Sequence, residues 1–312
     1  MTLVLFFHFH KISHRNCTLM ELDMTRSNLS LGSFTGFNRF SDFMCSSSLT
    51  RPFLSDKSMN KHLLDAICHD EFELVYQPQT DIFGHNVVGV EALLRWNSSA
   101  LGMVSPSVFI PLAEKSGLIS DIGKLVIDKA CAQAAIWKRR YSSNLRIAVN
   151  VSYIQVHDKS IVQFIESCLN KYELDINALE IELTESSLIT DTSKVIRVLN
   201  ELKDIGIRTA IDDFGTGYSS LSYLASMPFS LIKIDRSFIS LLGENLATTA
   251  ITQSIIELSK KLEMEVLAEG VETLKQKSIL IQSECGFMQG NLFSCPVTAE
   301  KIPHIVGLEK CQ

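Results

Sequence analysis

Polar side chains recur near the ends of apolar, strand-like segments along this chain. The clearest case is VVGVEALLRW, residues 87–96, which carries Glu91 among apolar, strand-forming residues. A buried carboxylate without a partner or a metal ion is costly, so this position needs one or the other. The other segments add further polar residues, and the complete set is Gln77, Glu91, Asn150, Glu182, Asp212, Asp213, Lys233, Glu269 and Gln289.

This set predicts a metal site with oxygen ligands. Five carboxylates and one asparagine gathered at one place, with a single lysine, would repel each other strongly unless cations were bound. A ligand set without His or Cys favours Mg²⁺ or Mn²⁺. The adjacent pair Asp212 and Asp213 would allow one carboxylate to bridge two ions while the other holds the second. Two such ions suit in-line displacement at a phosphorus atom by an activated water.

Each residue also has an ordinary structural explanation. A single acid at a strand end is most often a loop cap or a salt-bridge partner. Asp212 and Asp213 could be a helix N-cap with a solvated neighbour, and Lys233 could simply neutralise a nearby acid. All of these explanations would have to hold at once, so the pattern favours a shared site.

Strand-like and helix-like segments alternate from about residue 58 onward. The strands are expected at 72–79, 87–96, 145–152, 179–185, 208–214, 231–235, 266–271 and 286–290. The helices are expected at 60–70, 106–117, 119–140, 161–172, 192–206, 219–227, 247–263 and 272–283.

This alternation predicts an α/β fold, a modified (βα)8 TIM-like barrel with an antiparallel first strand pair. The antiparallel pair follows from the short turn DIFGHN between the first two strands, which is typical of a hairpin. In such a barrel, functional residues lie at the C-terminal ends of the strands. We therefore expect Gln77 to end the first strand and Glu91 to lie in the later half of the second.

Composition narrows the class of protein. The 312 residues are 46% hydrophobic and carry a net charge of -6, which argues against binding a nucleic-acid polymer by charge. The eight cysteines form no C-x-x-C pair, which favours buried, reduced thiols in a cytoplasmic protein over a zinc site. The opening MTLVLFFHFHK is too short to span a bilayer and lacks the early charge of a signal peptide, so we expect no membrane span.

Residues 1–57 differ from the rest of the chain. They are rich in Ser, Phe, Asn and Gly and show neither a helical nor a strand period. We interpret them as a poorly ordered or regulatory N-terminal extension ahead of a catalytic domain at 58–312.

Seven motifs occur in a fixed order between about residue 60 and about residue 305. They are EALLRW, NVS, ELTE, DDFGTGYSS, KIDRSF, AEGVE and QG-x-LFS-x-P. In sequence and order they resemble the EAL-domain family of cyclic-di-GMP phosphodiesterases. The resemblance implies a modified (βα)8 barrel that hydrolyses cyclic di-GMP to linear 5′-pGpG in bacterial second-messenger signalling. It also implies a two-metal site with Mg²⁺ or Mn²⁺ and a homodimer.

The resemblance further implies a role for each matching residue. The first-metal ligands would be Glu91, Asn150, Glu182 and Asp212, and the second metal would lie among Asp212, Asp213 and Glu269. Lys233 would lie beside the attacking water. Glu269 would act as general base or as second-metal ligand, two roles that the sequence does not separate.

The remaining assignments concern the substrate and the loops. Gln77, Arg95 and Gln289 match substrate-binding positions, and Gln289 also matches a supporting one. An arginine suits a phosphate because its charged fork offers two donors. Glu185 matches the acid that holds the DFGTGYSS loop, and Glu272 matches a supporting residue.

Two positions depart from the family pattern. LFSCP places Cys295 where the family often has Arg, and Asn291 follows QG where an aromatic residue is usual. Affinity or selectivity for the substrate could therefore differ. The alternatives are an inactive EAL-type receptor or protein-interaction domain, and an unrelated metal-dependent phosphoesterase on the same barrel. The GGDEF stretch of diguanylate cyclases does not occur in the sequence.

Overall fold

The computed structural model describes residues 56–141, 143–158, 160–185, 192–217, 224 and 226–308. The extension expected at 1–57 lies outside the described residues except for its last two, and so does most of the helix expected at 219–227. The first described element is helix α1 (Asp56–Cys68), which buries Met59, Leu63 and Ala66.

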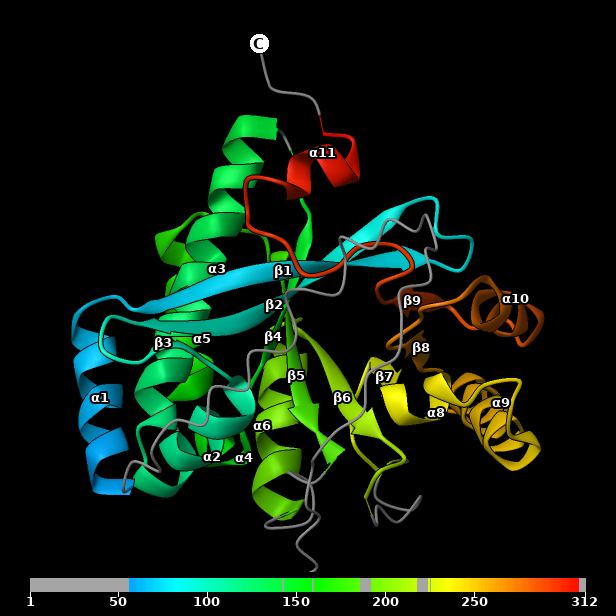
Figure 1. The fold of residues 1–312 in the computed structure, drawn as a ribbon, viewed down its shortest axis with the longest axis horizontal. Coiled ribbons are helices and arrows are strands. Elements are labelled where there is room, and N and C mark those ends of the chain that lie inside the picture. The colour runs from blue at the N-terminus through cyan, green and yellow to red at the C-terminus, as the bar shows by residue number, and fades with distance from the viewer. Residues whose placement is uncertain are drawn as a thin grey trace, which may run out of the picture. The chain divides into compact units, whose positions relative to one another are not determined.

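Eight strands close into a barrel (Figure 1). They are β1 (Phe72–Asp81), β2 (Val87–Ser98), β4 (Arg146–Asn150), β5 (Leu179–Thr184), β6 (Arg208–Phe214), β7 (Leu231–Ile234), β8 (Glu265–Ala268) and β9 (Phe287–Gln289). The strand order is β1-β9-β8-β7-β6-β5-β4-β2, and β1 pairs with β2 to complete the ring. The short strand β3 (Gly102–Val104) pairs with the end of β2. The predicted α/β barrel is confirmed.

Strand β1 is the reversed strand of the barrel. It is antiparallel to β2 on one side and to β9 on the other, whereas the remaining barrel pairs are parallel. The antiparallel first pair is therefore confirmed, but the expected place of Gln77 is wrong. Gln77 lies in the middle of β1, opposite Glu91. Glu91 is in the first half of β2, so its expected place in the later half is also wrong. Because β1 runs backwards, its last residue Asp81 pairs with the first residue of β9, Phe287.

Helices follow most of the strands. They are α2 (Pro106–Ser116), α3 (Ile119–Tyr141), α4 (Tyr153–Val156), α5 (Ile161–Lys171), the 3-10 turn η1 (Ile176–Ala178), α6 (Thr192–Asp204), α8 (Arg236–Ser240), α9 (Leu246–Lys261), α10 (Leu274–Gln282) and α11 (Ile302–Val306). Helix α6 is an example of an amphipathic helix. Its apolar residues recur at helical spacing and are buried: Val195, Val198, Leu199 and Leu202. Within the described part of the chain, no helix combines the length and apolar character needed to cross a bilayer.

The interior of the barrel changes character along its axis. Side chains two residues apart on a strand point to the same face. On β6 and β7, Ala210 and Leu231 therefore share a face with Asp212 and Lys233, which lie nearer the C-terminal ends. Ala210 and Leu231 pack with Leu267 in a small buried apolar cluster. An apolar layer thus lies beneath a polar layer that is nearer the C-terminal ends of the strands.

The described cysteines are free thiols. Cys131, Cys168 and Cys285 are buried, and burial raises the pKa of each thiol. Cys68 and Cys295 are exposed, so the expectation of buried thiols holds for three of the five.

Candidate active site

The centre of the polar layer is the ammonium group of Lys233, which is fully buried. Its Nζ lies 2.7 Å from Glu269 Oε1, 2.8 Å from Glu182 Oε2 and 3.1 Å from Asp212 Oδ1. Glu91 Oε1 is farther, at 3.8 Å. Four strands or strand ends therefore bring four acids around one cation, as the sequence pattern predicted.

Several acids surround one buried lysine, and the pKa values of the lysine and of two of the acids are raised. Burial by itself would lower the pKa of Lys233, but Asp212, Glu182 and Glu269 outweigh burial and raise it well above the usual value. Burial raises the pKa of Glu182 and of Glu269, against the opposing effect of Lys233. Lys233 thus remains an ammonium group, while the site as a whole retains an excess of negative charge for a cation to neutralise.

Two amides complete the surroundings of Glu91, which is 5% exposed. Asn150 Nδ2, at the end of β4, donates to Glu91 Oε1 at 2.7 Å. Gln289 Nε2, at the end of β9, donates to Glu91 Oε2 at 2.6 Å. The carboxylate within the apolar strand therefore has two hydrogen-bond donors and a nearby ammonium group.

The donor set fits divalent cations that prefer oxygen ligands. Two groups of acids have carboxylate oxygens within 4.8 Å of one another: Glu91 with Glu182 and Asp212, and Asp212 with Asp213 and Glu269. Glu182 Oε1 is buried and has no hydrogen-bond partner among the described residues, although an unpaired carboxylate oxygen is costly at such a place. Asp212 belongs to both groups, so it is placed where a bridging ligand would be. All of these donors are oxygens, as Mg²⁺ and Mn²⁺ require.

The loop after β6 is hydrogen-bonded to the side chain of Glu185, which is 2% exposed. Glu185 Oε2 accepts hydrogen bonds from the backbone N–H of Gly215 at 2.7 Å and of Gly217 at 3.2 Å. At the start of the same loop, the N–H of Asp213 donates to Asp212 Oδ1 at 2.9 Å, and Asp213 has a positive φ of 54°. Glu185 is therefore a buried acceptor of loop N–H groups and not a solvated surface acid.

Of the proposed substrate residues, Gln77 and Gln289 are hydrogen-bonded to each other, whereas Arg95 is not part of this pair. Gln289 Nε2 also donates to Gln77 Oε1 at 3.1 Å, and Gln77 Nε2 donates to the carbonyl of Ser294 at 3.1 Å. This chain links Glu91 to the loop that contains Cys295. Sequence reasoning missed Ser294, because its carbonyl is a backbone group that every residue has. Arg95 is half-buried on β2, and its Nη1 donates to the carbonyl of Leu94.

Glu272 lies apart from the cluster. Its Oε1 is 2.8 Å from Arg236 Nη2, and both side chains are well exposed, at 42% and 66%. The structure thus brings Glu272 to a surface ion pair next to the loop that follows β8. Asp235 is an acid that the sequence reasoning did not single out. It lies close enough to Asp213 to contribute to raising the pKa of that group.

A largely apolar cavity of about 250 Å³ adjoins the cluster. Its polar rim includes Arg95, Asn150 and Thr184, and its walls include Ile122 and Val126. Asn150 therefore borders both the acidic cluster and the cavity. A flat, partly apolar group could enter the cavity while its charged part stays near the acids.

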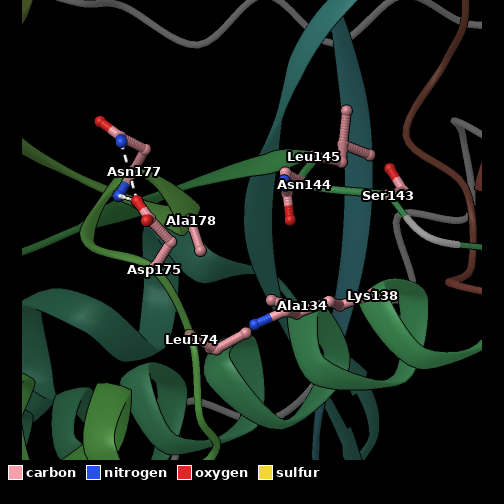
Figure 2. Close-up of a pocket in the computed structure, with 9 residues that line it drawn as sticks. All are labelled: Ala134, Lys138, Ser143, Asn144, Leu145, Leu174, Asp175, Asn177 and Ala178. Atoms are coloured by element: carbon pink, nitrogen blue, oxygen red, sulfur yellow. Dashed lines mark hydrogen bonds between the residues drawn. The ribbon is translucent and has the colours of Figure 1, made fainter.

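A second hollow, of about 190 Å³, lies at the other end of the strands (Figure 2). Its lining includes Leu145 and Ala178, which directly precede β4 and β5. Asp175, on its rim, already accepts hydrogen bonds from Asn177, as the dashed lines in Figure 2 indicate. Barrel enzymes place their chemistry at the C-terminal ends of the strands, so this hollow is not the candidate active site.

The affinity for cations at Asp213 should depend on pH. Burial, followed by Asp212 and Asp235, raises the pKa of Asp213 to about 6. A bound cation requires the carboxylate, so we expect Mn²⁺ affinity to rise between about pH 5 and about pH 7 as Asp213 loses its proton. Calorimetric titrations across this range would measure it, with Asp213→Asn as the control that should flatten the dependence.

The same group affects the stability of the metal-free protein, in the opposite direction. The pKa of Asp213 is higher in the folded state than its usual value, so protonation favours folding. This contribution is present in full at low pH and is lost as the pH rises through about 6.

For the metal-affinity prediction, a pH dependence of Mn²⁺ affinity that survives in Asp213→Asn would show that another group is responsible.

Comparison with known proteins identifies the family of this chain. Residues 60–296 match the sequence model of the EAL domain. The chain is 41% identical over 244 residues to the signaling protein YkoW of Bacillus subtilis, covering 78% of this chain and 30% of that protein. It is 41% identical over 231 residues to a cyclic di-GMP phosphodiesterase of Pseudomonas aeruginosa, covering 74% of this chain and 39% of that protein. The chain thus spans only about a third of the length of these relatives.

A solved structure gives the same result in three dimensions. The PaMucR phosphodiesterase, in complex with c-di-GMP, has a TM-score of 0.74 and 38% identity, covering 78% of this chain and 99% of that one. The family match covers most of the chain, and the motif acids converge at the mouth of the barrel. The chain belongs to the EAL domain family.

Proposed function

We propose that this chain is a metal-dependent phosphodiesterase that hydrolyses cyclic di-GMP to linear 5′-pGpG in bacterial second-messenger signalling. The observation that carries the proposal is the complete group of acids around Lys233, three of which lie within 3.1 Å of its Nζ. Relatives named for this activity, and the PaMucR complex with c-di-GMP, support the choice of substrate.

In this proposal the acids hold two divalent cations, Mg²⁺ or Mn²⁺. The first would be held by Glu91, Asn150, Glu182 and Asp212, and the second by Asp212, Asp213 and Glu269. The bound cations would lower the pKa of a water molecule and neutralise charge on the phosphodiester. Glu182 Oε1 and Gln289 Oε1, which have no partner within the described part of the chain, are available to accept hydrogen bonds or to bind a cation.

The chain's own residues would orient the reactants. Lys233 has three N–H donors, and three carboxylates lie within 3.1 Å of its Nζ. It would donate an N–H to a water molecule once a cation binds one of these carboxylates in its place. Glu269 lies 2.7 Å from Lys233, and its raised pKa suits a group that accepts a proton from water. Glu269 could serve as this base or as a ligand of the second cation.

The substrate would lie across the C-terminal mouth of the barrel. Arg95 would bind a phosphate, and the cavity beside it would receive a planar base. Gln77 and Gln289 would act together, because they are hydrogen-bonded to each other and to Glu91. Cys295 is exposed and supplies no positive charge, so phosphate binding would depend more strongly on Arg95.

The alternative is an inactive domain that binds cyclic di-GMP, or a protein partner, without cleavage. The completeness of the acidic set favours the enzyme. The test is incubation of the purified chain with cyclic di-GMP and Mg²⁺, followed by chromatography of the nucleotides. The enzyme yields pGpG, whereas the receptor retains binding and returns unchanged cyclic di-GMP.

We further propose that residues 58–312 carry this activity, that the protein works as a homodimer, and that it acts in the cytoplasm. The family match begins at residue 60, which supports the domain limit. A chain that begins at Asp56 keeps the whole of α1 and should hydrolyse cyclic di-GMP as the full chain does.

Metal choice should follow from the geometry of the ligands. Mg²⁺ and Mn²⁺ should both support turnover, whereas Ca²⁺ should not. Ca²⁺ takes longer bonds and more ligands, and it would displace the water held between two ions. Turnover measured after removal of metal and addition of each ion tests this. Comparable rates with Ca²⁺, or a requirement for zinc, would contradict the proposed ligand set.

A further inference from the structure

Helix α8 (Arg236–Ser240) begins three residues after Lys233 and packs on two loops, each of which lies next to an acid of the cluster. Figure 1 shows α8 directly after β7. The first loop follows β6 and contains Gly215, two residues after Asp213. The second loop follows β8 and contains Gly270, next to Glu269. One side chain of α8 packs on each glycine.

The ring of Phe238 lies against the backbone of Gly215. A Cβ atom at Gly215 would lie 2.7 Å from Phe238 Cε2 and 2.9 Å from Cζ, closer than van der Waals contact allows. Gly215 also has a φ of +101°, which side-chain-bearing residues rarely adopt. The N–H of this glycine donates to Glu185. The loop is therefore fixed by a hydrogen bond to its N–H and by a ring packed against its backbone.

The stem of Arg236 occupies the corresponding place at Gly270, whose φ is +66°. A Cβ atom there would lie within 3.0 Å of the Cβ, Cγ and Cδ atoms of Arg236. The guanidinium group then extends to Glu272, its partner in the surface ion pair. The start of α8 is itself fixed, because Asp235 Oδ1 accepts a hydrogen bond from the N–H of Ser237 at 2.9 Å.

We propose that Phe238 and Arg236 are positioning residues, which hold Asp213 and Glu269 at the distance that the second cation requires. The inference rests on the proposed function, in which these two acids and Asp212 bind that cation. The acids of the other group have a different support. Glu91, Glu182 and Asp212 lie at paired positions of β2, β5 and β6. Asp213 is also in β6, but it follows the last pair of β5 with β6 and lies at the register shift between Ile211 and Phe214, so strand pairing fixes it less.

This difference predicts a selective effect. Phe238→Ala should weaken Mn²⁺ binding at the second site by about tenfold or more, as is typical when a partner that orients a metal ligand is lost. Binding at the first site should stay close to that of the wild-type chain, since strand pairing is unaffected. Arg236→Ala should act on the same site, and Phe238→Leu should restore part of the affinity because it keeps an apolar side chain against Gly215.

The test is a titration of the full chain with Mn²⁺ in the absence of nucleotide. Electron paramagnetic resonance and calorimetry measure the binding of the ion. Phe164→Ala is the matched control, because Phe164 on α5 is also partly buried and packed on the core. Thermal unfolding of each variant shows whether the fold is kept, and Phe238→Leu remains informative if Phe238→Ala does not fold.

Selective loss of the second Mn²⁺ in the Phe238 variants, with two ions retained in Phe164→Ala, supports the inference. An equal weakening of Mn²⁺ binding at both sites would overturn the inference, as would a loss that Phe164→Ala reproduces. A wild-type chain that binds only one Mn²⁺ ion would also overturn it. These readings do not require turnover. A wild-type chain that binds two ions but leaves cyclic di-GMP intact would refute the proposed function and still decide the role of α8.

Discussion

Replacing Lys233 with methionine should abolish turnover and markedly destabilise the metal-free protein. Methionine has a similar length but no charge, so Glu182, Asp212 and Glu269 would lose the ammonium group that lies within 3.1 Å of each. Removing one partner of a buried ion pair typically costs about 3–5 kcal/mol. Turnover should fall because no other cationic side chain contacts these acids among the described residues.

Added metal should reverse part of the stability loss and none of the loss of turnover. Divalent cations would supply the missing positive charge to the carboxylates but not the N–H donors of the lysine. Denaturant unfolding in EDTA and in Mg²⁺ measures the first effect, and pGpG formation measures the second. Lys260→Met, which breaks a surface pair with Glu284, should alter neither. A Lys233→Met protein with wild-type stability in EDTA would show that the acids do not depend on this cation.

Replacing Glu185 with alanine should lower turnover by about a hundredfold or more while the fold is kept. The carboxylate accepts the N–H groups of Gly215 and Gly217, and hydrogen bonds to an ionised acceptor are roughly twice as strong as neutral ones. Without them the loop after β6 would lose one of the two contacts that fix it and would keep the packing of Phe238 on Gly215. Misplacement of a catalytic group by about 1 Å can cost about 100-fold in rate.

The fold should persist in this variant because Glu185 follows β5 and leaves the pairing of β5 with β4 and β6 unchanged. Turnover measured against Mg²⁺ concentration should show a higher metal requirement. Glu185→Gln should be intermediate, since the amide oxygen still accepts an N–H but carries no charge. Glu201→Ala, on the exposed face of α6, is the control. Wild-type turnover in a folded Glu185→Ala protein would refute an anchoring role.

The sequence was sufficient to predict most of the barrel and the residues at its centre. Asp212 and Lys233 follow or lie in strongly apolar segments, and strand alternation fixes which residues share a face. Parallel pairing then brings their C-terminal ends to one mouth. The eight strands, and the gathering of the acids around Lys233, follow from these local signals.

Other features depend on tertiary structure and could not be read from a pattern. Gln77 reaches the level of Glu91 from mid-strand, because β1 pairs antiparallel to β2 along most of its length and to β9 at its C-terminal end. Helix α8 has only five residues, too few for a helical period. The outward position of Glu272 is set by its pairing with Arg236 across 36 positions of sequence. For Gln77 and Glu272, the contact that sets the position is with residues distant in the sequence.

The most direct test of the central claim is hydrolysis of cyclic di-GMP in water enriched in oxygen-18. If a water molecule held beside Lys233 attacks phosphorus, its oxygen joins the new 5′-phosphate of pGpG and the bond to the 3′-oxygen breaks. Mass spectrometry of the product should therefore find one heavy oxygen, on that phosphate, in the presence of Mg²⁺. Recovery of unchanged cyclic di-GMP from a metal-loaded protein that binds it would contradict the account.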